Sequence, residues 1–398
     1  MPAPALLIPN LGAEEGPGWR ERVARAPLCW PARLWRSLFP RGARLPDFLP
    51  ALAWPEGLPA SDEPALAWLE PSQPSFAWLL DAEACAIATA HGAPLCDERI
   101  GAVRHCHDKA FAARFAAARG LEPACWRGLC AIFEPEELRQ GARSQRAVLE
   151  RVAAWPAWTR GRFALKPRFG SSARGRASGQ LAAPADTWSG ALPRLAARGG
   201  AVLEPWVARD SDCAAELFVD AKGEVSLLAT LAHESNPAGA PRAHSGRLGA
   251  GGRVRAASGF DAELESAALA IARAAADAGF RGPCGVDAFS FRGPGGARVL
   301  RPIVELNARF TLGHVVQGVL ARALPALGAA LPDSAAFRVG PPPAAPAPAA
   351  AARLRVDLFT PAESAAGAPC LELWDPAFAA EPQSRQGPTS IESGSSWA

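Results

Sequence analysis

The most constraining feature of the sequence is an alternating segment in its last third, Ile303 to Phe310. Glu305, Asn307 and Arg309 occupy every second position, and apolar residues occupy the positions between them. If the segment is a β-strand, the three polar side chains share one face, because successive side chains point to opposite sides. Glu and Asn oxygens suit Mg²⁺, and an Arg beside them can bind a phosphate or a carboxylate. An ordinary strand with one exposed face alternates in the same way, so the segment alone leaves both interpretations open.

Residue usage makes the remaining Lys and Asn residues unusual. The 398 residues include three Asn and three Lys, and nearly all of the 42 basic residues are Arg. In a chain that uses Arg so consistently, we expect a remaining Lys or Asn to be required by chemistry more often than elsewhere. Lys109, Lys166 and Asn307 are therefore candidates for a functional site.

Charge and cysteine content argue against several classes of protein. A net charge of +3 is small for this length, so it indicates neither a nucleic-acid partner nor an anionic membrane. The nine Cys residues form no CxxC pair, which is typical of reduced thiols in a cytoplasmic protein. The apolar run at Ala5–Ile8 is too short for the core of a signal peptide, and no apolar run approaches a membrane span. We expect a soluble cytoplasmic protein.

Strand and helix patterns alternate along the chain. The first hundred residues are rich in Pro and Trp, and they combine short apolar runs with a helical pattern at Asp81–His91. The clearest helix is Asp261–Ala278, followed by Gly279 as a stop signal. Further expected elements are a helix at Lys109–Arg119 and strands at Ala5–Ile8, Phe76–Leu80, Arg162–Lys166, Ala201–Val207, Ala214–Val219, Glu224–Leu231 and Leu354–Phe359.

A hairpin is expected around the turn Gly293-Pro294-Gly295-Gly296. Its arms are Gly285–Phe291 and Val299–Phe310. If the arms pair so that their polar faces align, Asp287 stands near Glu305, and two strands together supply one metal site.

A second motif begins at Lys166, where the expected strand enters a segment rich in Gly, Ser and Arg. Such a turn offers backbone N–H groups, hydroxyls and cations that can cover a polyphosphate. It is not a P-loop, because the Lys precedes the glycines. A flexible basic loop is the alternative interpretation. Ser171, Ser172, Arg174 and Arg176 are weaker candidates than Lys166.

The order of these segments resembles the ATP-grasp superfamily. The series runs from Lys109 through the Lys166 loop, then Leu203–Val207 and Gly285–Asp287, and ends with Glu305–Arg309. The resemblance covers about residues 100 to 325. It implies an α/β (α+β) ATP-grasp fold with a preceding N-terminal α/β domain and two α+β subdomains that clasp a nucleotide.

The resemblance also implies a division into four parts. These are an N-terminal pre-ATP-grasp α/β domain at 1–100, a lid-side subdomain at 101–200, a metal-binding subdomain at 201–330, and a Pro/Ala-rich linker with a C-terminal tail at 331–398.

What the resemblance implies for single residues follows from the matched positions. Arg309 and Lys166 would act in catalysis, with Arg309 stabilising the transferred phosphoryl group. Mg²⁺ (or Mn²⁺) would be held by Asp287, Glu305 and Asn307. The residues implied to bind ATP are Lys109, Lys166, Ser171, Ser172, Glu204, Trp206, Val207 and Asp212, with Asp210 as a second candidate for the ribose.

The activity implied is that of an ATP-dependent ligase. It would activate a carboxylate as an acyl phosphate for attack by an amine or a similar nucleophile, releasing ADP. The substrate would be a small molecule or a peptide that carries a carboxylate, and homodimers are common in this family. A phosphotransferase (kinase) on the same fold and a nucleotide-binding module without turnover are the alternatives. The sequence names neither the acid nor the nucleophile.

Two histidine motifs remain outside this series. His105-Cys106-His107, taken as a strand, cannot converge on a metal because its side chains point to opposite faces. His233, His244 and Arg247 lie in a segment that either borders the acceptor site or forms a plain surface loop.

Overall fold

The computed structural model of the chain describes most of its residues, in ten segments. These are residues 4–15, 18–25, 28–49, 52–70, 73–170, 174–236, 241–249, 252–328, 334–342 and 353–374. Among them, no helix is both long enough and apolar enough to cross a membrane.

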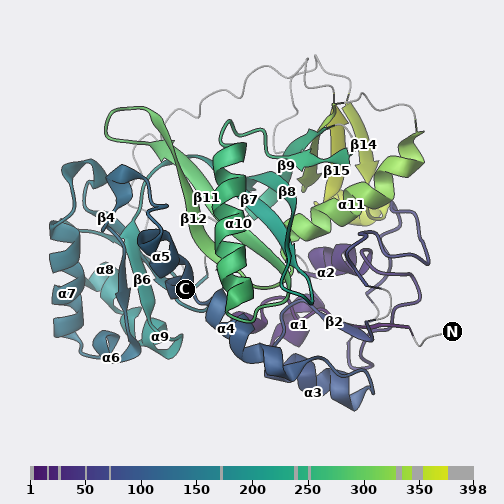
Figure 1. Cartoon of the computed structure of the whole chain (residues 1–398), viewed down its shortest axis with the longest axis horizontal. Coiled ribbons are helices and arrows are strands. Elements are labelled where there is room, and N and C mark those ends of the chain that lie inside the picture. Colours follow the sequence, from purple (N-terminus) through teal and green to yellow (C-terminus); the bar gives the residue numbers. More distant parts are fainter. Residues whose placement is uncertain are drawn as a thin grey trace.

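The N-terminal unit is built on a pair of parallel strands, β1 and β2 (Figure 1). The Asp81 side chain caps helix α3 by accepting a hydrogen bond from the Ala84 N–H. Trp35, Phe39 and Phe76 pack in its core, which explains the density of aromatic residues in this part of the sequence. Its elements are β1 (Leu6–Ile8), η1 (Ala13–Glu15), α1 (Trp19–Val23), α2 (Cys29–Arg36), β2 (Ser75–Ala77) and α3 (Ala82–Ala90).

Two helices lead from this unit to the rest of the chain. Helix α4 (Ile100–His107) follows the short η2 (Asp97–Arg99), and α5 (Lys109–Ala118) follows directly. Asp108 separates the two helices and caps α5 by accepting a hydrogen bond from the Ala110 N–H. Helix α5 packs against both β6 and β12, so it lies between the two larger sheets (Figure 1).

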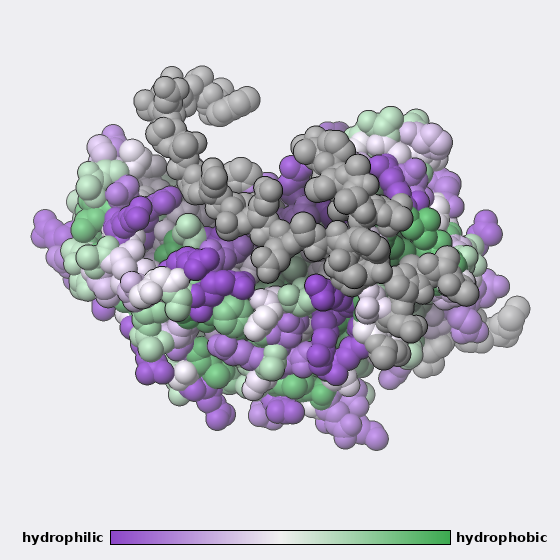
Figure 2. All heavy atoms as spheres, turned by 90° about the horizontal axis from the view of Figure 1, so that it is seen from above, coloured by the Kyte–Doolittle hydropathy of each residue, from purple (hydrophilic) through white to green (hydrophobic). Residues whose placement is uncertain are grey.

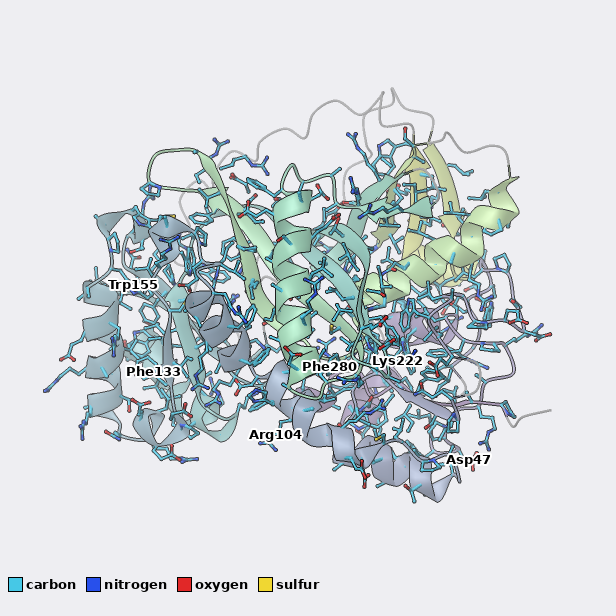
Figure 3. The ribbon with its side chains drawn as sticks, viewed as in Figure 1. Asp47, Arg104, Phe133, Trp155, Lys222 and Phe280 are labelled. Carbon is cyan, nitrogen blue, oxygen red and sulfur yellow. The ribbon has the colours of Figure 1, made fainter. Side chains whose placement is uncertain are left out.

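The smaller of these sheets is antiparallel, with the strand order β3-β6-β4-β5. Phe163, Leu165 and Leu203 pack with Trp188 and Val148 in a core of its own. Figure 3 shows Phe133 and Trp155 in this part of the molecule. Its elements are η3 (Ala124–Trp126), β3 (Ala131–Phe133), α6 (Pro135–Leu138), α7 (Ala142–Ala153), η4 (Ala157–Thr159), β4 (Arg162–Pro167), β5 (Ala177–Gln180), α8 (Asp186–Ser189), α9 (Leu192–Ala197) and β6 (Ala201–Pro205).

Within the described residues, the larger sheet has nine strands in the order β12-β11-β7-β8-β10-β9-β13-β15-β14. Helix α10, at the centre of the view in Figure 1, packs against β7, β8 and β12, and its buried side chains include Leu264, Ala268 and Ile271. Helix α11 packs against α2 and so joins this sheet to the N-terminal unit. The elements are β7 (Arg209–Val219), β8 (Val225–Ser235), β9 (Pro241–Leu248), β10 (Val254–Arg255), α10 (Asp261–Asp277), β11 (Gly282–Arg292), β12 (Arg298–Asn307), α11 (Leu312–Leu327), β13 (Ala336–Gly340), β14 (Arg353–Asp357), α12 (Pro361–Ala365) and β15 (Cys370–Trp374).

The mixed α/β class expected from the sequence is confirmed, and the expected hairpin has the register that a shared site requires. Asp287 lies directly opposite Glu305 in the β11–β12 pair. Two details differ from expectation. His105-Cys106-His107 belongs to helix α4, so the strand interpretation is wrong. The segment expected to be a linker and tail contributes β13 and β15 to the large sheet, besides β14, which overlaps the strand expected at Leu354–Phe359. The division into domains stays a prediction.

The outer surface mixes hydrophilic and hydrophobic residues over the described part of the face in Figure 2. Few large apolar side chains are exposed. Among the described residues, the large apolar side chains that are exposed are Phe48, Leu181 and Leu354. The polar residues of interest lie instead in an internal cleft.

Candidate functional site

One cleft is lined by all three parts of the molecule, with about 1340 Å³ of empty space. The N-terminal unit contributes Glu14 and Trp78, the small sheet contributes Lys166, and the large sheet contributes Asp287 and Glu305. Seven of the residues predicted from the sequence line this cleft together: Lys109, Lys166, Asp212, Asp287, Glu305, Asn307 and Arg309.

Asp287, Glu305 and Asn307 form a set of oxygen-bearing side chains on β11 and β12. Asn307 Nδ2 donates to Asp287 Oδ2 at 3.1 Å. Desolvation raises the pKa of Asp287 well above its ordinary value, and the charge of Glu305 raises it further. Two carboxyl groups and an amide oxygen that crowd together in this way suit Mg²⁺ or Mn²⁺. Among the described residues, no group of three or more His, Cys, Asp and Glu side chains is arranged to hold a metal.

Lys109 connects this set to the Lys166 loop. Its Nζ lies 3.2 Å from Glu305 Oε2 and donates to the Gly170 carbonyl at 2.6 Å. Desolvation alone would raise the pKa of Glu305, but Lys109 and then Lys166 outweigh it and hold the pKa below its ordinary value. Glu305 is therefore the charged member of the Asp287–Glu305 pair.

Glu204 is the centre of a second ionic group. Lys166 Nζ lies 2.5 Å from Glu204 Oε1, and Arg301 Nη1 donates to Glu204 Oε2 at 2.6 Å. Desolvation disfavours the Glu204 carboxylate, yet Arg301 and Lys166 lower its pKa to about 2. The Glu204 side chain is 2% exposed and does not line the cleft, so its charge positions Lys166 and Arg301.

The other predicted nucleotide contacts lie near this group. The guanidinium carbons of Arg176 and Arg209 lie 4.0 Å and 5.1 Å from the Trp206 ring centroid. Asp212 Oδ1 accepts from Arg209 Nη1 at 2.7 Å and lines the cleft. The remaining predicted residues lie elsewhere: Val207 packs beside Trp126 and Phe289, Asp210 pairs with Arg292 and Arg298, and Ser171 and Ser172 lie outside the described residues.

Arg309 follows β12 and lies close to the metal-type set, which is Asp287, Glu305 and Asn307. Its Nη2 donates to Asn307 Oδ1 at 3.3 Å, and its Nη1 donates to the Phe310 carbonyl at 2.7 Å. Its Nε lies 3.0 Å from Glu14 Oε1 of the N-terminal unit. The guanidinium is thus held at the end of the strand, facing the cleft.

Sequence reasoning missed several residues of the site. Glu14 and Arg301 carry no local pattern, and they reach the site through contacts between segments far apart in the chain. His107 Nδ1 accepts from the Ala308 N–H at 3.3 Å, so the His motif supports the Arg309 segment. Burial and then Arg309 lower the pKa of His107 to about 4.

Glu216 is another missed residue, and it lines the cleft beside Thr311 and Gly313. Its carboxylate accepts from Thr311 Oγ1 at 2.5 Å and lies 3.1 Å from His314 Nδ1. A Cβ on Gly313 would come within 2.0 Å of this carboxylate, so a glycine is needed there. Glu216 lies on β7 opposite Gly285, so a prediction of this strand pairing could have suggested that Glu216 faces the site.

The two sheets are arranged around one cleft. The four-stranded sheet and the large sheet border one cleft, with Lys166 on the first and Asp287, Glu305 and Asn307 on adjacent strands of the second. This arrangement agrees with the ATP-grasp fold that the sequence resemblance implies.

Comparison with known proteins finds solved structures that are similar to this chain. No family model and no curated protein matches the chain. A carboxyaminoimidazole ribonucleotide synthase from Aspergillus clavatus, complexed with ATP, is 14% identical with a TM-score of 0.47, over 85% of this chain and 82% of that one. The biotin carboxylase domain of 2-oxoglutarate carboxylase from Hydrogenobacter thermophilus is 13% identical with a TM-score of 0.46, over 94% and 86%. A biotin carboxylase from Campylobacter jejuni is 13% identical with a TM-score of 0.45, over 76% and 70%.

Proposed function

We propose that the protein is an ATP-dependent ligase that activates a carboxylate as an acyl phosphate for attack by an amine or a similar nucleophile. The observation that supports this most is the convergence of Asp287, Glu305, Asn307 and Arg309 at one end of the β11–β12 hairpin, inside one cleft with Lys109. This combination offers oxygen ligands for a divalent cation and fixed positive charges for phosphate groups.

Each side chain of the set has a proposed role. Lys109 and Lys166 neutralise phosphate charge of ATP, and Arg309 holds the oxygens of the group that is transferred. Asp287, Glu305 and Asn307 hold Mg²⁺ or Mn²⁺, which when bound supplies further charge neutralisation at the phosphates. The substrate carboxylate forms a bond to the γ-phosphorus while the bond from that phosphorus to the bridging oxygen breaks, and ADP leaves with the electron pair. The amine nitrogen then forms a bond to the acyl carbon while the bond from that carbon to the phosphate oxygen breaks, and phosphate leaves with a proton from the nitrogen.

The contacts of the Asp287 and Glu305 carboxyl groups favour a ligase over a kinase. A carboxylate acceptor is already ionised at neutral pH, whereas a hydroxyl acceptor needs a base to take its proton. Asp287 is hydrogen-bonded to Asn307, and Glu305 is paired with Lys109, so both carboxyl groups already have partners. A chemistry without a protein base therefore fits this set better.

The test is ADP release from ATP and Mg²⁺ with a panel of acids, each with and without an amine. Hydroxylamine in place of the amine converts an acyl phosphate to a stable hydroxamate, which reports activation of the acid directly. ADP release that depends on an acid, with hydroxamate formation, is the expected result. Phosphate transferred to a stable ester would indicate the kinase, and ATP binding without any product would indicate the binding module.

The cellular setting belongs to the same proposal. We propose a small-molecule or peptide substrate with a carboxylate, no nucleic-acid or membrane partner, and a cytoplasmic location. A homodimer stays a prediction, which the molar mass in solution would test.

A further inference from the structure

An ion pair in the cleft joins the N-terminal unit to the catalytic strand. Glu14 lies in η1, and its Oε1 is 3.0 Å from Nε of Arg309, which follows β12. The two side chains are 3% and 10% exposed, and both line the cleft. The pair therefore places one negative and one positive charge side by side, next to the proposed site of phosphoryl transfer.

Arg309 still has binding capacity at this position. Its two terminal nitrogens donate to the Phe310 carbonyl and to Asn307 Oδ1. Its Nε is close to Glu14 but has no aligned hydrogen-bond partner among the described residues. A buried donor without an acceptor is costly, so a ligand oxygen that aligns with Nε would be bound favourably.

The N-terminal wall of the cleft beside this pair is apolar. Leu11 and Trp78 are each 4% exposed, and Leu28 and Pro31 line the same cleft. The Trp78 ring centroid lies 5.7 Å from the guanidinium carbon of Arg309. A wall of this kind favours an apolar group on the ligand, because it offers no partner for a polar one.

We propose that the acid activated by this enzyme is an α-amino acid with an apolar side chain. Its carboxylate binds Arg309, its ammonium binds Glu14, and its side chain packs against Leu28, Pro31 and Trp78. This inference rests on the proposed function, since the carboxylate held by Arg309 is the one that receives the phosphoryl group. The ammonium keeps its protons during that step.

Charge balance favours an amino acid over a simple acid. A zwitterion separates Glu14 from Arg309 and gives each of them an opposite charge in place of the one it loses. A carboxylate without an amine takes Arg309 from Glu14 and brings no positive charge in its place, so Glu14 has one charged partner fewer. The ammonium of the ligand is thus the feature that Glu14 selects.

The test is a binding measurement with two ligands of the same carbon skeleton. Leucine and 4-methylpentanoate differ only in the amine, and each is dialysed to equilibrium against the full-length protein with Mg²⁺ and a non-hydrolysable ATP analogue. We expect leucine to bind about 10- to 100-fold more tightly, the range for a charge-assisted hydrogen bond. Glu14→Gln should remove most of this preference by weakening leucine and leaving 4-methylpentanoate within about threefold.

Glu56→Gln is the matched control, because Glu56 also lies in the N-terminal unit but pairs with Arg33 near the surface. It should leave both affinities unchanged. Equal binding of the two ligands to the wild type, binding of neither, or equal weakening of both by Glu14→Gln would overturn the inference.

ADP release measured on the same samples separates this inference from the proposed function. Leucine binding that depends on Glu14, without ADP release for any acid and nucleophile, would contradict the ligase and support the amino-acid subsite. ADP release with equal efficiency from leucine and from 4-methylpentanoate would support the ligase and overturn the subsite.

Discussion

Two carboxyl groups of the molecule, the buried Glu204 and the half-buried Asp287, have opposite electrostatic surroundings. Glu204 lies between Lys166 and Arg301, which lower its pKa to about 2. Asp287 lies opposite Glu305, and the pKa of Asp287 is raised. The cation nearest to that pair, Lys109, is bound to Glu305. The Glu204 charge is therefore balanced by cations of the protein, whereas Asp287 still benefits from an added cation.

The largest effect on activity is expected when two of the proposed metal ligands are replaced. Glu305→Ala combined with Asn307→Ala should lower ADP release by at least about a thousandfold, because phosphate charge is no longer offset. Steady-state ADP release measures this, with thermal melting to verify folding. Glu234→Gln is the control, since Glu234 pairs with Arg338 outside the set. Full activity in the double variant would refute the assignment.

A large loss of stability is expected at the other member of the comparison. Glu204→Ala leaves the Lys166 and Arg301 charges buried without their common partner. The free energy of unfolding should fall by about 3–5 kcal/mol, the usual range when one partner of a buried ion pair is removed. Urea unfolding measures it. A loss below about 1 kcal/mol would mean that water, rather than Glu204, satisfies these two cations.

The pH dependence of stability should have opposite signs at the two sites. The pKa of Asp287 is raised on folding, so above about pH 4 the folded protein holds a proton that the unfolded chain has released. Stability should therefore fall as pH rises, and Asp287→Asn should remove this fall in EDTA. The pKa of Glu204 is lowered from 4.5 to about 2, so its stabilisation is lost as pH falls through that range. Urea unfolding from pH 3 to 8 measures the pH profile of stability. The comparison would be contradicted if Asp287→Asn and Glu204→Ala changed this profile in the same direction.

The smallest effect is expected from Asp287→Asn in metal-free protein near pH 7. Removing the disfavoured acid while keeping its shape should raise the free energy of unfolding by about 1 kcal/mol or leave it unchanged. Urea unfolding in EDTA tests this, with Asp277→Asn, at the end of α10, as the control. A clear destabilisation would show that the Asp287 carboxylate is satisfied without a cation.

The sequence predicted those parts of the site that have a local pattern. Alternation and the Gly-rich turn were sufficient for the β11–β12 hairpin, whereas the register that places Asp287 opposite Glu305 was left open by the sequence. The apolar stripe and the stop at Gly279 were sufficient for α10. These features depend on residues close together in the chain, which is why periodicity reports them.

The remaining contacts depend on how distant segments pack. Arg301 reaches Glu204 across the two sheets, and Glu14 reaches Arg309 from the far end of the chain. No local spacing encodes such contacts. The His motif was misjudged because a short apolar-polar run suits either a strand or a helix, and packing on the neighbouring segments selected the helix α4.

The central claim is that Asp287, Glu305 and Asn307 hold a divalent cation together with ATP. The most direct measurement is titration calorimetry of Mg²⁺ into the protein with a non-hydrolysable ATP analogue, for the wild type and for Asp287→Asn. We predict nucleotide-dependent Mg²⁺ binding that the substitution weakens by about 10- to 100-fold, a typical effect for a ligand of a metal site. Equal Mg²⁺ affinity in the two proteins would contradict the account.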